Sequence, residues 1–411
     1  MPDISKRGIR MPNSPIRKLV PLAEEAIRRG TTVYRLNIGQ PDIPTSPNAL
    51  ESIRNMAAKV VDYGHSAGNE SLRRKFARYY KTINIDLEYS DILITTGASE
   101  AITLTLLTCL NAGDEIIVPE PFYANYFSFA IASDVNVVPI TSNIETGFAL
   151  PPISEFEKLI TPKTRAIIIC NPNNPTGHVY SYEDLKQLRD LVLKHDLFFI
   201  CDEVYRDLCY DGKTFASAMQ ITRLEKHLVL IDSVSKRYSA TGLRVGVMAS
   251  KNKALLQTAL KFCQARLCPP NIGQLAAEAA LDSPPEYLDM VYQEFLKRRN
   301  FIVKELNSME GVYCPVPKGA FYVMVKLPVD DAEKFAMWML QEFSYNDQTV
   351  MLAPGSGFYF NTNLGKQEVR VAYVLNIDDL KKAMECLRRG LMAYPGRQVG
   401  EKKIETIAGN R

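Results

Sequence analysis

One lysine stands in an unusual setting near the middle of the chain. Lys236 lies in the segment SVSKRYSATGLRVG, directly after the apolar run HLVLID and among small hydroxyl residues. A lysine in water has a pKa of about 10.4 and is a poor nucleophile. Partial burial and neighbouring cations, which Arg237 and Arg244 could supply, lower that pKa and free the neutral amine. The segment therefore offers a nucleophilic amine, although a solvated surface lysine would also fit it.

A carboxylate comes at the end of a second apolar run. Asp202 follows DLFFIC and opens the segment DEVYRDLCY. A buried carboxylate needs a cation or a hydrogen-bond donor, which a structural salt bridge or a protonated pyridine nitrogen would provide. In the second case the carboxylate keeps the ring cationic, and a cationic ring withdraws electrons from a substrate carbanion. Tyr205, three residues further on, can point the same way.

Two further segments place polar groups after apolar runs. In NPNNPTG, which follows AIIIC, the Asn and Pro residues force a turn, and Asn174 could donate a hydrogen bond to a phenolic oxygen. In TTGASEA, which follows DILI, Gly97 precedes a helix start whose free N–H groups, together with the Ser99 hydroxyl, favour an anion such as phosphate. Both segments are also compatible with ordinary turns.

Aromatic and basic residues complete the set of candidates. Tyr123 and Tyr126 in PEPFYANY follow another apolar run, where they could stack on a ring or simply belong to the core. Arg370 is a charged residue inside the strand-like segment EVRVAYV. Its planar guanidinium matches a carboxylate in bidentate fashion, so we expect Arg370 to bind the carboxylate of a substrate.

The elements that must position these residues alternate between strand and helix. Amphipathic segments such as SYEDLKQLRDLVLKH, where Ser181 and Asp184 are close to a capping box, separate apolar runs of strand length. This alternation indicates a mostly parallel sheet covered on both faces, and ligands of such sheets bind at the carboxyl ends of the strands. The expected strands cover residues 91–96, 115–120, 135–140, 165–170, 196–203 and 227–233.

The pattern changes after about residue 285, where a long charged helix and the strand-like segments GVYCPVPKGAFYVMVKL and EVRVAYV indicate a smaller α+β domain. The predicted fold class is α/β, with a large three-layer domain around a mostly parallel sheet plus this smaller domain. We expect an N-terminal segment at residues 1–45 that packs with the small domain, a large domain at 46–285 and the small domain at 286–411. A helix is expected over residues 15–29.

Composition argues against several classes of protein. The net charge is +3, from 49 basic and 46 acidic residues, which gives no reason to expect nucleic acid or a membrane surface as a partner. There is no signal-peptide core and no apolar run long enough to span a membrane. The eight cysteines show no C-x-x-C spacing and the four histidines are scattered, so we expect free thiols, no metal and a cytoplasmic location.

Taken in this order, the segments resemble the class I/II aminotransferases of pyridoxal-phosphate fold type I, a group similar to aspartate aminotransferase. The resemblance runs from IGQPD, which begins at Ile38, to VRVAYV, which begins at Val369. It implies pyridoxal 5'-phosphate as cofactor, bound by the large domain. It makes Lys236 the Schiff-base lysine and, with Asp202 and Tyr205, a catalytic residue.

The resemblance also implies a wider set of contacts. Asp202 pairs with the ring nitrogen. Further cofactor contacts are Ala98, Ser99, Ser233 and Arg244 at the phosphate, Tyr123 stacked on the ring, and Asn174 and Tyr205 at its 3-oxygen. The substrate is implied to bind at Gly39, Asn174 and Arg370. Tyr63, in VDYGHSAGNESLRR, matches a tyrosine that reaches the neighbouring subunit's phosphate, which implies a homodimer with shared active sites.

One position departs from a subgroup pattern. Some prokaryotic aspartate enzymes of the family carry a lysine where Ser99 stands, and its absence weakens an aspartate-specific interpretation. Arg17 and Lys18 lie in the segment that closes over substrate in relatives. Either could bind a side-chain carboxylate, but simple solvation at the surface is the favoured interpretation. Aspartate, alanine, aromatic and broad donor preferences all stay open.

The implied reaction is a ping-pong transfer of an amino group from an L-amino acid to a 2-oxo acid, with 2-oxoglutarate as the expected acceptor. A lyase on the same fold, either a C–S lyase or an enzyme similar to aminocyclopropane-carboxylate synthase, is the alternative, because it would share the cofactor site. A transcriptional regulator built on this fold is disfavoured, because the segment before IGQPD is short and lacks a basic recognition helix.

Overall fold

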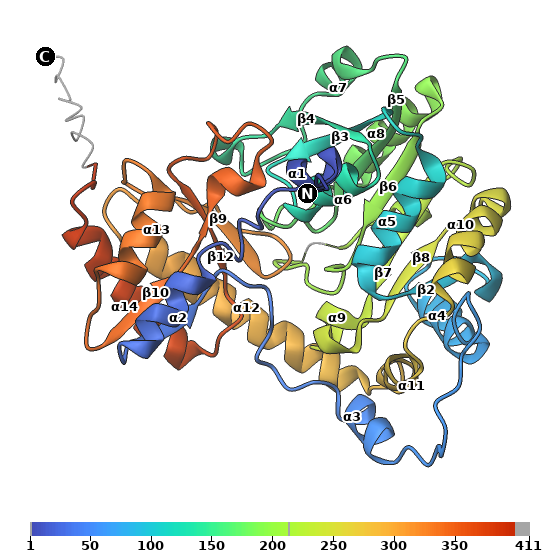
Figure 1. The fold of residues 1–411 in the computed structure, drawn as a ribbon, viewed down its shortest axis with the longest axis horizontal. Coiled ribbons are helices and arrows are strands. Elements are labelled where there is room, and N and C mark those ends of the chain that lie inside the picture. Colours follow the sequence, from blue (N-terminus) through green and yellow to red (C-terminus); the bar gives the residue numbers. More distant parts are fainter. Residues whose placement is uncertain (1, 213, 399–411) are drawn as a thin grey trace, which may run out of the picture.

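Seven strands form the central sheet of the larger lobe (Figure 1). The computed structural model describes residues 2–212 and 214–398. The strand order is β2-β8-β7-β6-β5-β3-β4, and neighbours run parallel except where β8 pairs antiparallel with β2 and β7. The strands are β2 (Ile92–Thr95), β3 (Glu115–Glu120), β4 (Asn136–Thr141), β5 (Thr164–Cys170), β6 (Phe198–Asp202), β7 (Leu228–Ser233) and β8 (Gly246–Ala249).

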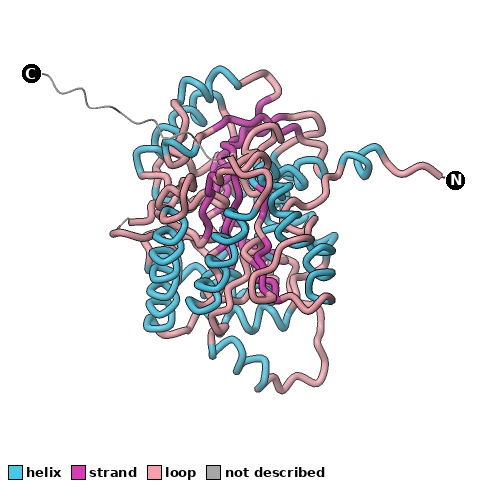
Figure 2. Tube along the Cα trace, turned by 90° about the vertical axis from the view of Figure 1, so that its left-hand side faces the viewer, coloured by secondary structure: helices cyan, strands magenta, loops and turns pink. Residues whose placement is uncertain are grey.

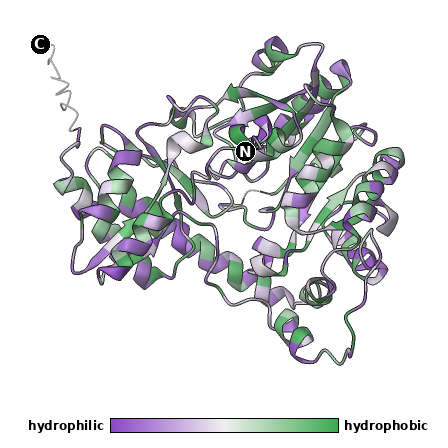
Figure 3. Cartoon of the chain, in the orientation of Figure 1, coloured by the Kyte–Doolittle hydropathy of each residue, from purple (hydrophilic) through white to green (hydrophobic). Residues whose placement is uncertain are grey.

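Successive apolar residues of each strand serve opposite faces of this sheet. In β5, Ala166, Ile168 and Cys170 belong to one buried cluster, whereas Ile167 and Ile169 belong to another. Side chains alternate across a strand, so a run with no polar residue is what a sheet covered on both faces requires. Figure 3 shows these strands as a hydrophobic band through the larger lobe.

Helices cover both faces of the sheet. The buried leucines of α8 (Tyr182–His195) pack on one face beside α7 (Ile153–Leu159), and Ser181 and Asp184 form the expected capping box. The other face is covered by α5 (Gly97–Cys109), α6 (Asn125–Ala132) and α10 (Lys253–Arg266). The predicted α/β class with a mostly parallel sheet is confirmed.

A smaller lobe lies beside the large sheet and is joined to it by the long helix α12 (Pro285–Asn307) (Figure 1). Its antiparallel sheet has the order β11-β12-β9, made by Ala353–Pro354, Glu368–Ala372 and Tyr322–Lys326. A parallel pair joins β1 (Thr32–Arg35) to β10 (Gln348–Met351), so the N-terminal segment is tied to the C-terminal part of the chain. The helices of this lobe are α2 (Val20–Arg28), α13 (Ala332–Gln341) and α14 (Ile377–Ala393).

The remaining helices are short or lie at the edges: α1 (Lys6–Arg10), α3 (Pro47–Arg54), α4 (Glu70–Thr82), α9 (Val234–Arg237) and α11 (Asn271–Ala280). Figure 2 shows the N-terminal arm with α1 projecting from the body. Arg7 in this arm pairs with Asp134, which follows α6. Within the described ranges, we find no helix with both the length and the apolar character needed to cross a membrane.

Two local predictions differ from the structure. The helix expected over residues 15–29 begins only at Val20, because residues 15–19 form turns that carry the chain across the cavity described below. Strand β8 was not expected from the sequence. Its place in the sheet is fixed by antiparallel pairing with β7 and with β2, and β2 is distant in sequence.

Candidate active site

The carboxyl ends of β5, β6 and β7 open onto a cavity of about 580 Å³. Cys170, Asp202 and Ser233, the last residues of these strands, all line it. All of the site residues predicted from the sequence lie in its wall except Tyr63, whose side chain is outside and 80 % exposed. Parallel strands end at the same edge of a sheet, so residues that are far apart in sequence meet here.

Lys236 lies on α9, the four-residue helix that follows β7. The Ser233 hydroxyl caps this helix by accepting from the Ser235 N–H at 3.1 Å. The Lys236 Nζ donates to the Gly39 carbonyl oxygen at 2.9 Å. Burial, followed by the charges of Arg370 and Arg244, lowers the pKa of this amine to about 8. A substantial fraction of the amine is therefore neutral near physiological pH.

The predicted source of this effect was partly wrong. Arg244 is one of the cations that act on Lys236, but Arg237 is not the other. The Arg237 side chain pairs with Asp207 and Asp232, away from the cavity wall. Arg370, which approaches from the small lobe, takes its place.

Asp202 ends β6 and is buried in the cavity floor. Its carboxylate accepts hydrogen bonds from the Tyr126 hydroxyl at 2.7 Å and from the Val204 N–H at 3.4 Å. Burial raises the pKa of Asp202 to about 6, because the charged form loses its hydration. A cationic ligand at this position would relieve that cost. Tyr126 was considered only as a stacking or core residue, and the structure shows it orienting Asp202.

An anion cradle lies at the start of α5. Gly97 has φ +78°, and a Cβ built on it would lie 2.4 Å from Nη2 of Arg244. A Cβ on Gly246 would lie 2.4 Å from the backbone carbon of Gly97. The two glycines therefore allow Arg244 and the helix start, where Ala98 and Ser99 lie, to approach closely. Helix N–H groups beside a guanidinium form a site for a phosphate.

The remaining cavity hydroxyls are held by local hydrogen bonds. The Ser233 hydroxyl contacts Ser235 and the Val245 carbonyl, each at 2.9 Å. The Tyr123 hydroxyl accepts from Nδ2 of Asn125 at 2.9 Å. The Tyr123 ring contacts the Tyr126 ring edge-on, with centroids 5.5 Å apart. Ser235 and Asn125 also line the cavity and were not predicted, since single polar residues inside turns give no periodic signal.

Arg370 is buried to 1 % exposure opposite Lys236. Its Nη1 donates to Oδ1 of Asn174 at 2.9 Å and its Nη2 to the Asn37 carbonyl. This contact assigns Oδ1 of Asn174 as acceptor and leaves the amide NH₂ as a donor toward the cavity. Among the described residues, Nε of Arg370 has no hydrogen-bond partner. Arg370 lines the cavity, and a guanidinium in a cavity wall is suited to receive a carboxylate.

Tyr322 is a cavity residue that sequence reasoning missed. Its hydroxyl lies 3.1 Å from that of Tyr205, and the Arg370 guanidinium stacks 4.3 Å from its ring centroid. A Cβ on Gly39 would fall 1.6 Å from the Tyr322 oxygen, so only glycine fits at that position. The signal available in the sequence was one polar-tipped aromatic residue at the start of the strand that pairs with the Arg370 strand.

The N-terminal segment lies against the same cavity. Ser14, Ile16 and Arg17 line it, and the Ile16 carbonyl accepts from Nδ2 of Asn37 at 2.7 Å. Lys18 instead pairs with Glu333 of α13. Across the described ranges, Arg17 makes no ion pair and no side-chain hydrogen bond. The structure therefore separates two neighbouring cations, one in the cavity wall and one paired outside it.

The cavity meets the chemical demands of pyridoxal 5'-phosphate. The phosphate requires an anion cradle, which α5 and Arg244 form. A protonated ring nitrogen requires a buried carboxylate, which Asp202 supplies. The aldehyde requires a neutral amine, which the lowered pKa of Lys236 provides. The Arg370 guanidinium, which also lines the cavity, is then left for a substrate carboxylate.

Comparison with known proteins agrees with this chemistry. Residues 31–387 match the family "Aminotransferase class I and II". Aspartate aminotransferase of Thermotoga maritima is 33% identical, over 93% of this chain and 97% of its own length. Aromatic-amino-acid aminotransferase 2 of Thermococcus litoralis is 31% identical, over 92% and 95%. The crystal structure of the Thermotoga maritima enzyme superposes with a TM-score of 0.86, at 32% identity, over 95% of this chain and 100% of that one.

These matches do not favour the lyase alternative, since the relatives are named as aminotransferases. Class I and II aminotransferases of this fold use pyridoxal 5'-phosphate and act on amino acids and 2-oxo acids. The chain therefore belongs to the class I and II aminotransferase family and is a pyridoxal-phosphate-dependent aminotransferase of fold type I.

Proposed function

We propose that this enzyme moves the amino group of an L-amino acid with an acidic side chain to a 2-oxo acid, 2-oxoglutarate foremost, by a ping-pong mechanism. One observation carries the proposal. The amine of Lys236, whose pKa is lowered, lines the same cavity as the buried carboxylate of Asp202 and the buried guanidinium of Arg370. When bound, pyridoxal phosphate supplies the aldehyde that takes up the amino group and a ring that stores the electron pair.

Lys236 is the proposed general base. Its amine lies at the end of a flexible side chain whose Nζ reaches the Gly39 carbonyl, beside the guanidinium that would hold the substrate. The amine removes the proton from the substrate Cα, holds it on Nζ and releases it on the cofactor side. A general base works best with a pKa near the working pH, and burial brings Lys236 into that range.

Asp202, the tyrosines and the phosphate-binding residues would hold and orient the cofactor. The Asp202 carboxylate, fixed by Tyr126, would face the ring nitrogen and keep it protonated. The Asn174 amide and the Tyr205 hydroxyl would hold the ring's 3-oxygen, while Tyr123 would stack on the ring. Ala98, Ser99, Ser233 and Arg244 would hold the phosphate. The substrate α-carboxylate would bind Arg370, with Gly39 and Asn174 beside it.

Arg17 supports an acidic donor. Arg244, Arg370 and Lys236 each have a role with the cofactor or the α-amino acid, and Arg17 is a further cation in the wall. Asn37 contacts both Arg370 and the carbonyl next to Arg17, so the two guanidinium groups are held on one side of the cavity. A second carboxylate on the substrate would pair with Arg17. The name of the Thermotoga maritima relative points to the same donor.

We propose that two copies of the chain form a homodimer. Val60, Val61 and Tyr63 expose 69%, 55% and 80% of their surfaces on the loop before α4. This loop is bonded to α11 through Asn271 and the Asp62 carbonyl, and Ile272 on α11 is also exposed. An exposed apolar patch of this kind marks a protein interface. In the dimer, Tyr63 would reach the phosphate of the partner site.

The chain's organisation and location follow as related proposals. We propose an N-terminal segment at residues 1–45, a large cofactor-binding domain at 46–285 and a small domain at 286–411. The β1–β10 pair supports the first boundary and the start of α12 at Pro285 supports the second. The eight cysteines are free thiols, which supports a location in the reducing cytoplasm.

Replacing Lys236 tests the catalytic assignment. Lys236→Ala removes the amine and is expected to lower kcat by at least about 10³-fold and to change the visible absorbance of the cofactor-loaded enzyme. Lys261→Ala, at an exposed position on α10, serves as the matched control and should behave as wild type. Normal turnover by purified Lys236→Ala would overturn the proposal.

The pH dependence of Lys236 gives a second prediction. An amine with a pKa of about 8 is protonated and unreactive below that pH and becomes reactive above it. Modification of the cofactor-free chain by an amine-directed reagent, followed at the Lys236 peptide by mass spectrometry, should therefore show its midpoint near 8. Arg370→Met removes a cation and should move the midpoint upward. A wild-type midpoint near 10.4, the ordinary lysine value, would contradict this assignment.

Arg17→Met tests the donor class. Loss of one charge-assisted contact should lower kcat/KM for aspartate and glutamate by about 10- to 100-fold and leave alanine nearly unchanged. Lys18→Met removes the neighbouring cation, which pairs with Glu333. It should leave kcat/KM unchanged for all three amino acids. Steady-state kinetics with the three amino acids provide the measurement. An equal loss for alanine, or no loss for any donor, would rule out a role in side-chain recognition.

Sedimentation equilibrium tests the homodimer. We expect twice the mass of the 46.2 kDa chain. Ile272→Asp places a charge in the apolar patch and should shift the equilibrium to the monomer and reduce activity. Met392→Asp, at an exposed apolar position on α14, should leave the dimer intact. A monomeric, fully active wild-type enzyme would exclude shared active sites.

A further inference from the structure

Five charged side chains form a second cluster behind the cavity, here called the buried ion network: Glu203, Arg206, Asp207, Asp232 and Arg237. Four of them are almost completely buried, and Asp207 is partly exposed. Within the described chain, none of the five lines the cavity. Removing this many charges from water is costly, and apolar residues would stabilise a core as well. Stability alone therefore does not account for five charges at this place.

Asp232 is the centre of the network. Its carboxylate lies 3.4 Å from Nη2 of Arg206 and 3.4 Å from Nη2 of Arg237. It also accepts from the Tyr80 hydroxyl of α4 at 2.9 Å and from the Ser233 N–H at 2.7 Å. One carboxylate thus connects the end of β7, the helix α9, the turn after β6 and α4.

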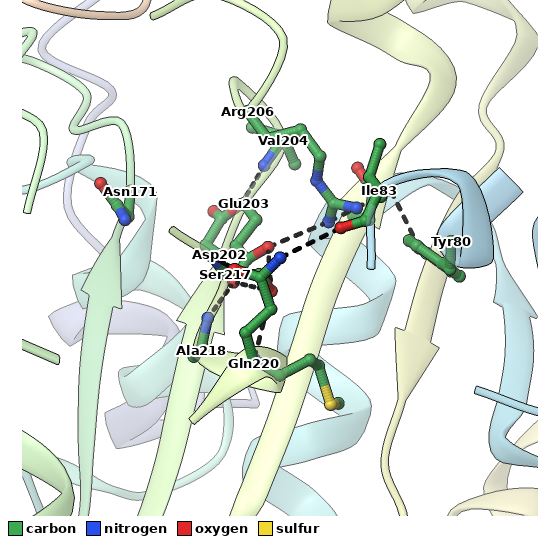
Figure 4. Close-up of polar contacts among 12 residues, drawn as sticks. Tyr80, Ile83, Asn171, Asp202, Glu203, Val204, Arg206, Ser217, Ala218 and Gln220 are labelled. Carbon is green, nitrogen blue, oxygen red and sulfur yellow. Dashed lines mark hydrogen bonds and ion pairs between the residues drawn. The ribbon is translucent and has the colours of Figure 1, made fainter. Parts of the chain in front are cut away.

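Glu203 anchors the other end of the network (Figure 4). Its carboxylate accepts from the Ser217 hydroxyl and from the Ala218 N–H, each at 2.9 Å, and contacts Nη2 of Arg206 at 3.2 Å. The backbone bond from the Arg206 N–H to the Glu203 carbonyl, 3.1 Å long, closes the same turn. Glu203 and Arg206 therefore hold the ends of the short segment that contains Tyr205.

The network and the cavity residues are neighbours in sequence. Glu203 follows Asp202, and Arg206 follows Tyr205. Asp232 precedes Ser233, and Arg237 follows Lys236. Adjacent side chains in strands and tight turns point to different sides. Each of these four cavity residues therefore has a network residue next to it that points away from the cavity.

Arg237 and Asp207 complete the connection. Nε of Arg237 donates to the Asp207 carboxylate at 2.5 Å, and the Arg237 guanidinium stacks 4.4 Å from the Tyr79 ring centroid. Helix α9 has only four residues and cannot be stable by itself. The ion pairs of Arg237 with Asp207 and Asp232 therefore fix α9, and with it Lys236, to the turn after β6.

We propose that the buried ion network is a positioning device, which fixes the Lys236 amine relative to the Asp202 carboxylate without touching cofactor or substrate. This inference rests on the roles proposed above for Lys236 and Asp202. The network spans the two elements that carry these groups, and its members are sequence neighbours of residues that line the cavity. Displacing a reacting group by about 1 Å costs on the order of 100-fold in rate, so a rigid support has a direct effect on turnover.

Asp232→Asn tests the proposal in the holoenzyme, because it keeps the shape of the side chain and removes the central charge. We expect kcat to fall about 10- to 100-fold, while KM for the amino donor changes little because Arg370 is untouched. The affinity of the cofactor-free chain for pyridoxal phosphate should fall as well. In that chain the pH midpoint of Lys236 modification should move away from its wild-type value, since a displaced amine changes its hydration and its distances from Arg370 and Arg244.

Two further variants keep the test decisive if Asp232→Asn does not fold. Arg237→Met should reproduce the losses, and Arg237→Lys, which retains the charge, should restore most of them. Asp211→Asn is the matched control, because it breaks the ion pair with the buried Arg299, remote from the cavity wall. It should lower stability and leave kcat, cofactor affinity and the Lys236 midpoint unchanged.

The outcomes separate this inference from the function on which it rests. If Lys236→Ala abolishes turnover but Arg237→Met and Asp232→Asn lower only stability, as Asp211→Asn does, the network is purely structural and the positioning role is wrong. If Lys236→Ala retains normal turnover, the proposed function itself fails. Loss of kcat with restoration by Arg237→Lys supports the positioning role.

Discussion

The structure depends on the burial of one amine and one carboxylate in the same cavity. Burial, followed by the charges of Arg370 and Arg244, lowers the pKa of the Lys236 amine to about 8. Burial also raises the pKa of Asp202 to about 6, so near pH 7 the two groups keep opposite charges but hold them less firmly than they would in water. A cofactor with a protonated ring nitrogen and an aldehyde matches both groups. The part of the cavity that both groups line is therefore defined by electrostatics as much as by shape.

The topology explains why much of this site could be predicted from sequence. The predicted cofactor residues Asn174, Asp202 and Ser233 lie at or just after the ends of apolar runs, and parallel strands bring those ends to one edge of the sheet. The runs are easy to recognise because both faces of the sheet are buried, which favours apolar residues at successive positions. The local sequence therefore predicts both the strand and the position of the site residue at its end.

What could not be predicted depends on contacts between distant segments. The sequence suggested Arg237, the next residue along the chain, as a cation near Lys236. In the structure α9 turns Arg237 toward Asp207 and Asp232, while β12 brings Arg370 into the cavity. The position of Tyr322 is set by the pairing register of β9 with β12, and that of Tyr126 by the start of α6. β8 is a strand because of its partners. None of these placements leaves a periodic pattern in the chain.

In the proposed function, substrate choice and catalysis belong to different parts of the fold. The proposed catalytic groups follow strands of the large sheet, with the buried ion network beside β6 and β7. Arg17 stands on a turn segment outside the sheets, whose contacts include Ile16 with Asn37 and Pro15 against Gly357. A guanidinium on such a segment can adjust to the length of a side chain without disturbing the amine below. Relatives with this sheet can therefore differ in donor, as the aspartate and aromatic enzymes do by name, while sharing one cofactor chemistry.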